Sequence, residues 1–315
     1  MLLVVLVQAS YTLRADDRPL QLCDEQPKLS LEGELWGTDA KVSSYKIEPI
    51  FAFTKAATDI VLLAHAQKGY RPQSELSVVF RVGPVGKTLR VLGDRVWVKS
   101  AGSIAPTQPI PFDRMPLNYE RAFGGWDRRG ADDPEHFQFE PRNPVGRGFR
   151  VAGSPFEEGV RLPNIEDPSD PVRHWGQSVH VAGLGFTSPN WQPRASLAGT
   201  YDEIWQKERM PLLPKDFDRR FFNSASPGLT APKYLLGNES VLVENASALG
   251  RLSFRLPGLQ PPSCRVQISQ ASDAMPELNM DTVVVDTDKN RLLLLFRGYI
   301  PLKGGPHDIK TIALE

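Results

Sequence analysis

The stretch that comes closest to phosphate-binding chemistry is RVGPVGKT, at residues 81–88. A P-loop needs a glycine five residues before the glycine of its Gly-Lys-Thr end, and that position holds Arg81. A P-loop also leads into a helix whose N-terminal N–H groups face the phosphates. The LRVLGDRVWV that follows is typical of a strand, so the pattern predicts a hairpin turn and not a nucleotide site.

Two further stretches combine glycine, arginine and aromatic residues: FGGWDRRG at 123–130 and NPVGRGF at 143–149. Neither lies between a predicted strand and a predicted helix, which a glycine-rich phosphate cradle requires. Glycine lets one backbone approach another closely, arginine presents a rigid fork of donors, and aromatic rings supply area to bury. These residue types predict either a shaped surface that binds another protein or loops that are locked onto the fold.

Catalytic residues in a recognisable spacing are missing from the sequence. There is no Gly-x-Ser-x-Gly nucleophile elbow and no His-Glu-x-x-His zinc motif. Asp127, Glu140 and Asp202 are carboxylates that would serve as an acid/base pair if the fold brought two of them into a cleft. A carboxylate-dependent hydrolase acting on glycans or peptides is therefore the alternative to a non-enzymatic binding protein. We expect no catalytic residue, metal site or cofactor.

The charge balance and the cysteines narrow the class of protein further. Lysine plus arginine and aspartate plus glutamate both number 37, so there is no global positive field for nucleic acid or an anionic membrane. Cys23 and Cys264 lie far apart and are predicted to be free thiols in a reducing compartment. No apolar run approaches the ~20 residues of a membrane-spanning helix. We therefore expect a cytoplasmic protein that binds neither nucleic acid nor membrane.

The elements that must position these residues are mostly short strands. Apolar runs separated by glycine and proline predict strands at 2–13, 58–66, 76–82, 88–98, 240–244, 251–256, 282–286 and 291–300. GPVGK joins the third run to the fourth, and TDKN joins the last two, so each pair is predicted to form a hairpin. GTYDEIWQKERMP predicts a short helix with Thr200 as N-cap, Glu203 completing a capping box, and an end at Pro211.

Between 106 and 195 strand-like runs are nearly absent, while glycine, proline, arginine and aromatic residues gather. Such a long stretch is usually functional or disordered, and its aromatic residues favour ordered loops packed on a β scaffold. We expect a mainly β fold, an antiparallel β-sandwich or twisted-sheet scaffold with long ordered loops and one or two short helices. The chain, 1–315, is predicted to be a single domain, with the irregular region at about 106–195 and a C-terminal β-hairpin region at about 240–315.

Several longer blocks, taken in order, resemble a known protein family. They are PFDRMPLNYERAFGG, NPVGRGF, LPNIEDP, WQPRASLAGTYDEIWQKERMPLLPKDFDRRFFNSASP and YLLGNESVLVEN, and the earlier KAATDIVLLAHA and LGDRVW also look like its N-terminal half. The family, long labelled a domain of unknown function, accompanies type VI secretion genes and acts as an adaptor or chaperone for secreted toxins. The resemblance implies a bacterial, non-enzymatic protein that binds an effector and helps to load it onto the VgrG/PAAR spike.

The motif residues of this family, with one neighbouring tryptophan, give the predicted partner-binding site. It comprises Arg121, Phe123, Gly124, Gly125, Trp126, Asn143, Arg147, Phe149, Trp191, Arg194, Asp202 and Trp205. An effector with an exposed apolar segment needs cover until it docks, which a β scaffold gives by strand addition or by an aromatic pocket. In the pocket hypothesis the loops supply Trp126, Phe149 and Trp191 as anchors. A structural subunit of the spike, forming symmetric oligomers unaided, is the third reading.

Overall fold

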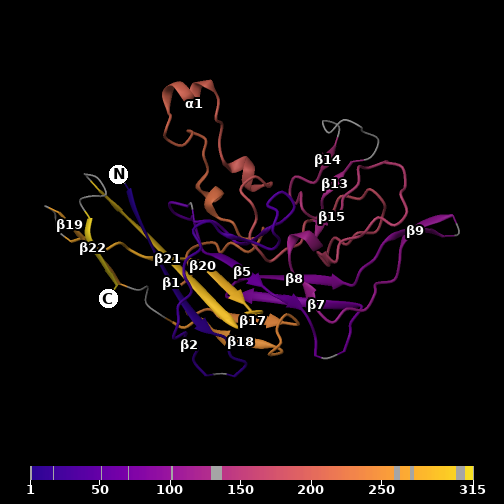
Figure 1. Cartoon of the computed structure of the whole chain (residues 1–315), viewed down its shortest axis with the longest axis horizontal. Coiled ribbons are helices and arrows are strands. Elements are labelled where there is room, and N and C mark those ends of the chain that lie inside the picture. The colour runs from indigo at the N-terminus through magenta and orange to yellow at the C-terminus, as the bar shows by residue number, and fades with distance from the viewer. Residues whose placement is uncertain are drawn as a thin grey trace.

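The protein is mainly β, as predicted, and its strands are organised around two five-stranded sheets (Figure 1). The computed structural model describes residues 2–16, 18–50, 52–69, 71–100, 102–128, 137–258, 263–269, 273–302 and 309–314. Among these residues, no helix has the length and apolar character needed to cross a membrane.

The first sheet joins segments from opposite ends of the chain. Its strands, in spatial order, are β2 (Gln21–Leu22), β1 (Leu2–Thr12), β21 (Arg291–Pro301), β20 (Asn279–Asp286) and β5 (Asp59–Leu63). β1 pairs antiparallel with β21 along its whole length, and β20 and β21 form the predicted hairpin. β20 also pairs parallel with β5, so this sheet is mixed and not purely antiparallel. β20 is buried at almost every position, which explains its unbroken apolar sequence.

The second sheet is antiparallel. Its strands, in spatial order, are β16 (Ile165–Glu166), β8 (Val85–Leu92), β7 (Glu75–Val82), β17 (Ser240–Glu244) and β18 (Leu252–Arg255). β7 and β8 form the first predicted hairpin, but its loop is only Gly83 and Pro84, because Val85 already pairs with Val82. The predicted strand at 88–98 is wrong in its middle, since β8 ends at Leu92 and β9 (Trp97–Ser100) belongs to a separate pair.

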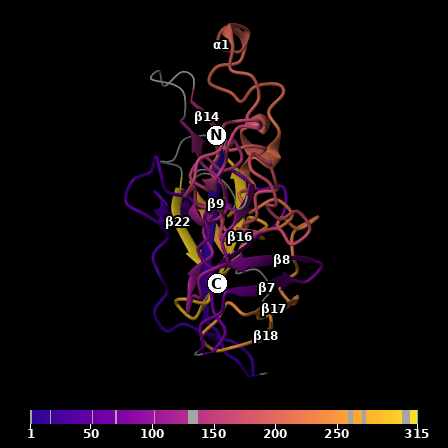
Figure 2. The same cartoon turned by 90° about the vertical axis from the view of Figure 1, so that its right-hand side faces the viewer.

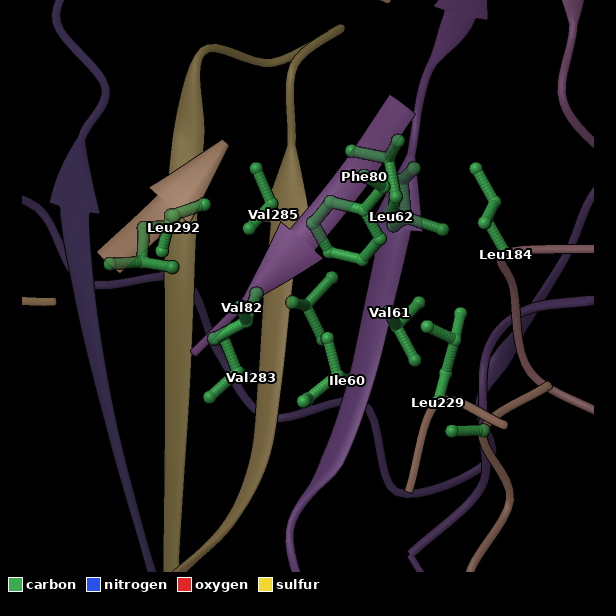
Figure 3. Close-up of a cluster of buried hydrophobic side chains, with 14 of the residues drawn as sticks. Ile60, Val61, Leu62, Phe80, Val82, Leu184, Leu229, Val283, Val285 and Leu292 are labelled. Carbon is green, nitrogen blue, oxygen red and sulfur yellow. The ribbon is translucent and has the colours of Figure 1, made fainter. Parts of the chain in front are cut away.

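The two sheets share one apolar core. Figure 3 shows Phe80 and Val82 of β7 beside Ile60 of β5 and beside Val283 and Val285 of β20. All five side chains are fully buried. Loop residues Leu184 and Leu229 close the outer edge of β5, where their carbonyls accept from the N–H groups of Leu62 and Ile60, both at 2.9 Å. The core therefore holds the sheets together and fixes the loops that follow them.

The remaining strands are short. They are β3 (Glu34–Leu35), β4 (Tyr45–Ile47), β6 (His65–Ala66), β10 (Ser103–Pro106), β11 (Met115–Pro116), β12 (Phe123–Gly124), β13 (Trp126–Asp127), β14 (Gln138–Phe139), β15 (Arg147–Gly148), β19 (Cys264–Ile268) and β22 (Ile309–Leu314). Three 3-10 turns lie at Tyr119–Arg121 (η1), Arg194–Leu197 (η3) and Arg219–Phe222 (η4), and the helix α1 spans Glu203–Glu208. Within the described part of 107–239 there are only two-residue strands and these helical segments, so the irregular region reaches beyond 195. Cys23 and Cys264 are free thiols, as predicted.

Candidate functional site

The two glycine-arginine motifs interlock with each other. β12 and β15 pair in parallel, with Phe123 opposite Arg147 and Gly124 opposite Gly148. The buried amide of Asn143 donates to the carbonyl oxygens of Tyr119 at 2.8 Å and of Phe123 at 3.0 Å, which ties one motif across the other. The sequence left two interpretations of these stretches, a protein-binding surface and loops locked onto the fold. For the backbone of their described residues, the structure shows loops locked onto the fold.

Two glycines of these motifs are needed because backbones pass too closely for a side chain. A Cβ on Gly124 would lie 2.1 Å from the carbonyl oxygen of Asn143, and its φ of +153° is one that other residues rarely adopt. A Cβ on Gly146 would lie 2.3 Å from Nδ2 of Asn143. The pair of glycine motifs is thus a packing device around one asparagine.

The arginines of both motifs converge on a second asparagine. Arg121 Nη1 and Arg147 Nη1 each donate to Oδ1 of Asn164 at 3.2 Å, and Arg121 also donates to Asp94 at 3.2 Å. Asn164 is fully buried and donates to the carbonyl of Leu92 at 3.0 Å, which fixes the cluster to the end of β8. Burial and the neighbouring charges of Arg121 and Arg161 lower the pKa of Arg147 to about 10. Asp94 and Glu120 act in the opposite direction, since their negative charges favour the charged form of Arg147.

Asp94 and Asn164 were not predicted as site residues. They lie within LGDRVW and LPNIEDP, two of the blocks that carry the family resemblance. No spacing rule brings position 94 to position 164, because β16 reaches β8 only through the folded sheet, where Ile165 pairs with Val91. The two sequence blocks could have marked Asp94 and Asn164 as candidate residues, but only the structure shows that they lie in contact.

Half of the predicted partner-binding residues are buried. Phe123, Gly124, Gly125, Asn143, Trp191 and Arg194 lie inside the fold. Trp191 is 3% exposed and its ring packs edge-on against Tyr119 at 5.2 Å, so the hypothesis that it anchors a partner is replaced by a role in holding the loop. Arg121, Arg147, Phe149 and Trp205 are half-buried, and Trp126 and Asp202 are exposed. A partner-binding role stays a prediction for this second group.

Trp126 forms an aromatic pair on the surface. β13 and β14 place its ring against that of Phe139, with centroids 4.5 Å apart in a stacked arrangement. The two residues are 39% and 41% exposed, respectively. Two large rings held against each other in contact with solvent are typical of a protein-binding surface, because aromatic anchors supply much of the binding energy there.

A second exposed apolar surface lies on residues 199–216, which we call the arm. α1 forms its tip and stands apart from the sheets in both views (Figures 1 and 2). The large exposed apolar side chains of the arm are Tyr201, Ile204, Met210, Leu212 and Leu213, with exposures from 38% to 63%. They were not predicted as partner-binding residues, although ERMPLLP is apolar around two prolines inside a charged stretch. An apolar run that follows neither a helix nor a strand period was therefore the sequence feature that could have indicated an exposed apolar surface.

The arm is braced by its own hydrogen bonds. Asp202 caps α1 by accepting from the N–H of Trp205 at 2.8 Å, so the prediction of Thr200 as N-cap is wrong. Thr200 instead closes the base of the arm, where its N–H and hydroxyl donate to Asp216 at 3.0 and 2.7 Å. The indole of Trp205 donates to the carbonyl of Leu212 at 2.7 Å, which joins the two sides near the tip. The exposed apolar residues are therefore held on an ordered element.

A buried ionic network fixes the base of the arm to the first sheet. Arg194 of η3 donates to the carbonyls of Phe221 at 2.7 Å and Thr187 at 2.5 Å, and it lies 3.9 Å from Glu48. Glu48 contacts Nζ of Lys55, which is fully buried and lies 2.8 Å from Oδ2 of Asp59 on β5. The chain of charges runs from the sheet to the arm.

Lys55 and Asp59 hold their charges against burial. Burial disfavours the charged forms of Lys55 and Asp59, but their mutual attraction outweighs it, so the pKa of Lys55 is raised and that of Asp59 is lowered. Asp59 also accepts hydrogen bonds from the N–H of Ser224 at 2.8 Å and from the side chain of Asn223 at 3.0 Å. A charged, fully hydrogen-bonded carboxylate of this kind is a structural group.

The three carboxylates of the hydrolase alternative also have partners in the fold. Asp127 accepts a hydrogen bond from the N–H of Val151 at 3.0 Å. Glu140 accepts from Nε of Arg142 at 2.6 Å and from Nη2 of Arg142 at 2.7 Å. Asp202 is the N-cap of α1. Among the described residues no group of three or more His, Cys, Asp or Glu side chains is placed to hold a metal ion.

A cavity of about 450 Å³ lies beside the motif loops. Its walls include Lys87, Arg142, Asp167 and His180. Burial lowers the pKa of Lys87 to about 8, and its ammonium lies within hydrogen-bond distance of the carbonyls of Gly183 and Pro227 and the hydroxyl of Ser226. Because an ammonium has three donors, this lysine is used in tying loops together.

The comparisons with known proteins give one match. A bacterial protein family, described as "Uncharacterized protein conserved in bacteria (DUF2169)", matches residues 1–297. No curated protein and no solved structure matches the sequence. The match spans both sheets, the interlocked motifs and the arm.

Proposed function

The chain belongs to this family of bacterial proteins, and from that premise we propose that it is a non-enzymatic adaptor or chaperone. It binds an effector of a type VI secretion system and helps to load that effector onto the VgrG/PAAR spike. The family description assigns no activity, so the proposal rests on the motif blocks and on the surfaces described above.

The observation that carries the proposal is the exposed apolar side of the arm. Ile204, Met210 and Leu212 are each at least 60% exposed, although burying such a side chain is worth about 2 kcal/mol. Soluble proteins rarely keep a group of large apolar side chains in water unless another molecule covers it. Since the arm is braced internally and anchored at its base, it presents this surface with little entropy left to lose on binding.

The aromatic pair adds a second contact. The pair is formed by Trp126 of β13 and Phe139 of β14. Both strands lie on the same side of the sheets as α1 in Figure 1, and β14 also does so in Figure 2. A partner that covers the arm and reaches this pair would bury two apolar surfaces at once. An effector with an exposed apolar segment is a partner of the matching chemistry, because each side hides apolar surface that is otherwise in contact with water.

The test is co-expression with the effector and spike-tip genes encoded nearby, followed by affinity purification and size exclusion. The variant carries Ile204→Ser, Met210→Ser and Leu212→Ser together. If these residues act as hot spots, worth ~2 kcal/mol each, the complex is lost at micromolar concentration.

A matched control keeps the test specific. The triple variant Leu31→Ser, Val42→Ser, Leu236→Ser removes equally exposed apolar residues from other surfaces and is expected to retain the complex. Both variants are checked for cooperative unfolding. The molecular mass of the protein without any partner is also measured, because a symmetric oligomer of this chain would favour a structural subunit of the spike. A complex that survives the arm variant unchanged contradicts the proposal.

A further inference from the structure

β18 is the outermost strand of the second sheet and has a free edge. All four residues of β18 have partners on β17, and just beyond them the N–H of Leu256 donates to the carbonyl of Glu239 at 2.9 Å. Counting back in steps of two, Phe254 and Leu252 are the residues of β18 whose backbone groups face β17. In an antiparallel ladder the residues between these point their backbone groups the other way. The N–H and C=O groups of Ser253 and Arg255 therefore face away from β17, and within the described residues they pair with no other strand.

The ladder continues beyond the end of β18. The N–H of Gly258 donates to the carbonyl of Gly237 at 2.7 Å, in register with the pairs before it. Pro257 thus occupies the next outward-facing position and offers a carbonyl but no N–H. The edge presents two outward N–H groups and then stops, which is typical of an edge that accepts a short strand but resists open-ended association.

A groove lies against β18 near this edge. It has a volume of about 610 Å³ and is lined by 253–257, by Ser240 of the neighbouring strand β17 and by 18–20. Its size is within the range of sites that take ligands. A chain that pairs with the outer edge of β18 would therefore lie next to this groove.

The charges at the groove select its occupant. Of the described residues that line it, the charged ones are Arg18 and Arg255. Arg18 shares Asp16 with Arg14, so this trio keeps one net positive charge. Within the described part of the chain, the guanidinium of Arg255 donates to the carbonyl of Asn238, at 3.5 Å. Exposed guanidinium groups pair well with carboxylates, which they bind with two parallel hydrogen bonds.

We propose that an extended acidic segment of a partner protein adds to the free edge of β18, with its backbone on Ser253 and Arg255 and its carboxylates against Arg18 and Arg255. Main-chain hydrogen bonds supply the binding and the arginines supply the preference for acidic sequences. The inference deepens the proposed function by naming a mode of partner binding. It rests on that function only for the identity of the natural partner.

The test uses a fluorescent peptide of alternating valine and glutamate, with a valine–lysine peptide of the same length as its counterpart. We expect the acidic peptide to bind in fluorescence anisotropy, to weaken as salt is raised, and to slow hydrogen exchange at the amides of Ser253 and Arg255. The basic peptide is expected not to bind.

Two variants separate the backbone contribution from the charge contribution. Ser253→Pro removes an outward N–H that β17 does not use and is expected to weaken the acidic peptide at least tenfold. Arg255→Glu is expected to do the same, whereas Arg81→Glu, an exposed reversal on β7 of the same sheet, leaves affinity unchanged. If the proline variant does not fold, Arg255→Glu and the exchange measurement still decide.

Three results overturn the inference: equal binding of the two peptides, unchanged exchange at both amides, or dimerisation of the protein through this edge. The arm triple variant is expected to bind the acidic peptide as the wild type does. If the wild-type protein does not bind the acidic peptide but still forms the arm-dependent complex, strand addition is refuted and the proposed function stands.

Discussion

Lys55→Met is the sharpest test of the buried ionic network. Lys55 has no exposed side-chain surface, and its Nζ lies 2.8 Å from Asp59 and 3.0 Å from the hydroxyl of Thr282. Methionine has nearly the same length, so the change removes the charge with little loss of packing. It leaves Asp59 and Glu48 buried without the cation between them. Breaking a buried pair in this way costs about 3–5 kcal/mol of unfolding free energy.

The size of this effect changes with pH in a direction that the pKa shifts fix. In the wild type the pKa of Asp59 is lowered, so its stabilisation is complete at neutral pH and is lost only as pH falls below about 4. In the variant Lys55 no longer opposes burial, which is the largest influence on this carboxyl, while the hydrogen bonds from Ser224 and Asn223 remain. We therefore expect the pKa of Asp59 to rise above its wild-type position, so that the folded state gains stability as pH falls. The difference between the two proteins is therefore largest at pH 8 and smaller at pH 5.

The assay is urea unfolding of both proteins at the two pH values, followed by tryptophan fluorescence. With a slope of about 3 kcal/mol/M, the midpoint at pH 8 is expected to fall by ~1 M or more. Adding Asp59→Asn removes the orphaned charge and should recover part of the loss. A cost below about 1 kcal/mol at pH 8, or the same cost at pH 5, would refute the argument that buried charge is the cause.

Three further predictions concern single sites. Gly124→Ala should lower the free energy of unfolding by about 3 kcal/mol, because its Cβ would overlap the carbonyl of Asn143, whereas Gly228→Ala, with positive φ but open space, should cost about 1 kcal/mol in the same thermal melts. Trp191→Ala should destabilise the fold by about 3–5 kcal/mol, because this ring is buried. Trp126→Ala should leave the thermal melt nearly unchanged and weaken the partner complex by ~2 kcal/mol, because this ring is exposed. The reverse pattern would contradict the assignment of the two tryptophans. Burial raises the pKa of the Cys264 thiol, so a maleimide should label Cys23 first in native buffer, and equal rates by peptide mapping would contradict its burial.

The local elements could be read from the sequence because their signals are local. TDKN between two apolar runs predicts the hairpin of β20 and β21, which the structure confirms. The strand at 88–98 failed because Gly93 passes so close to the carbonyl of Ile110 that a Cβ there would lie 1.7 Å from it, a contact made by tertiary packing. Thr200 failed as a cap because Asp216, distant along the chain, takes its hydrogen bonds.

The residue types of the candidate site could be predicted from the sequence, but the exposure of each side chain could not. Arginine, glycine and aromatic residues did mark the interlocked loops, but the same motif gives a buried Phe123 and an exposed Trp126. Which ring faces water depends on the parallel pairing of β12 with β15, and two-residue pairs carry no periodic signal. The apolar residues of the arm were missed because ERMPLLP has no period that would assign them to an exposed or a buried face.

The pairing of β1 with β21, and of β5 with β20, also sets the order of events during synthesis. β1 is synthesised long before β21, yet each residue of β1 has its partner on β21. The first sheet therefore cannot close until β21 has been made, and the apolar strands made early must wait unpaired while more than two hundred residues follow. Contacts this distant in sequence slow folding and lengthen exposure to aggregation.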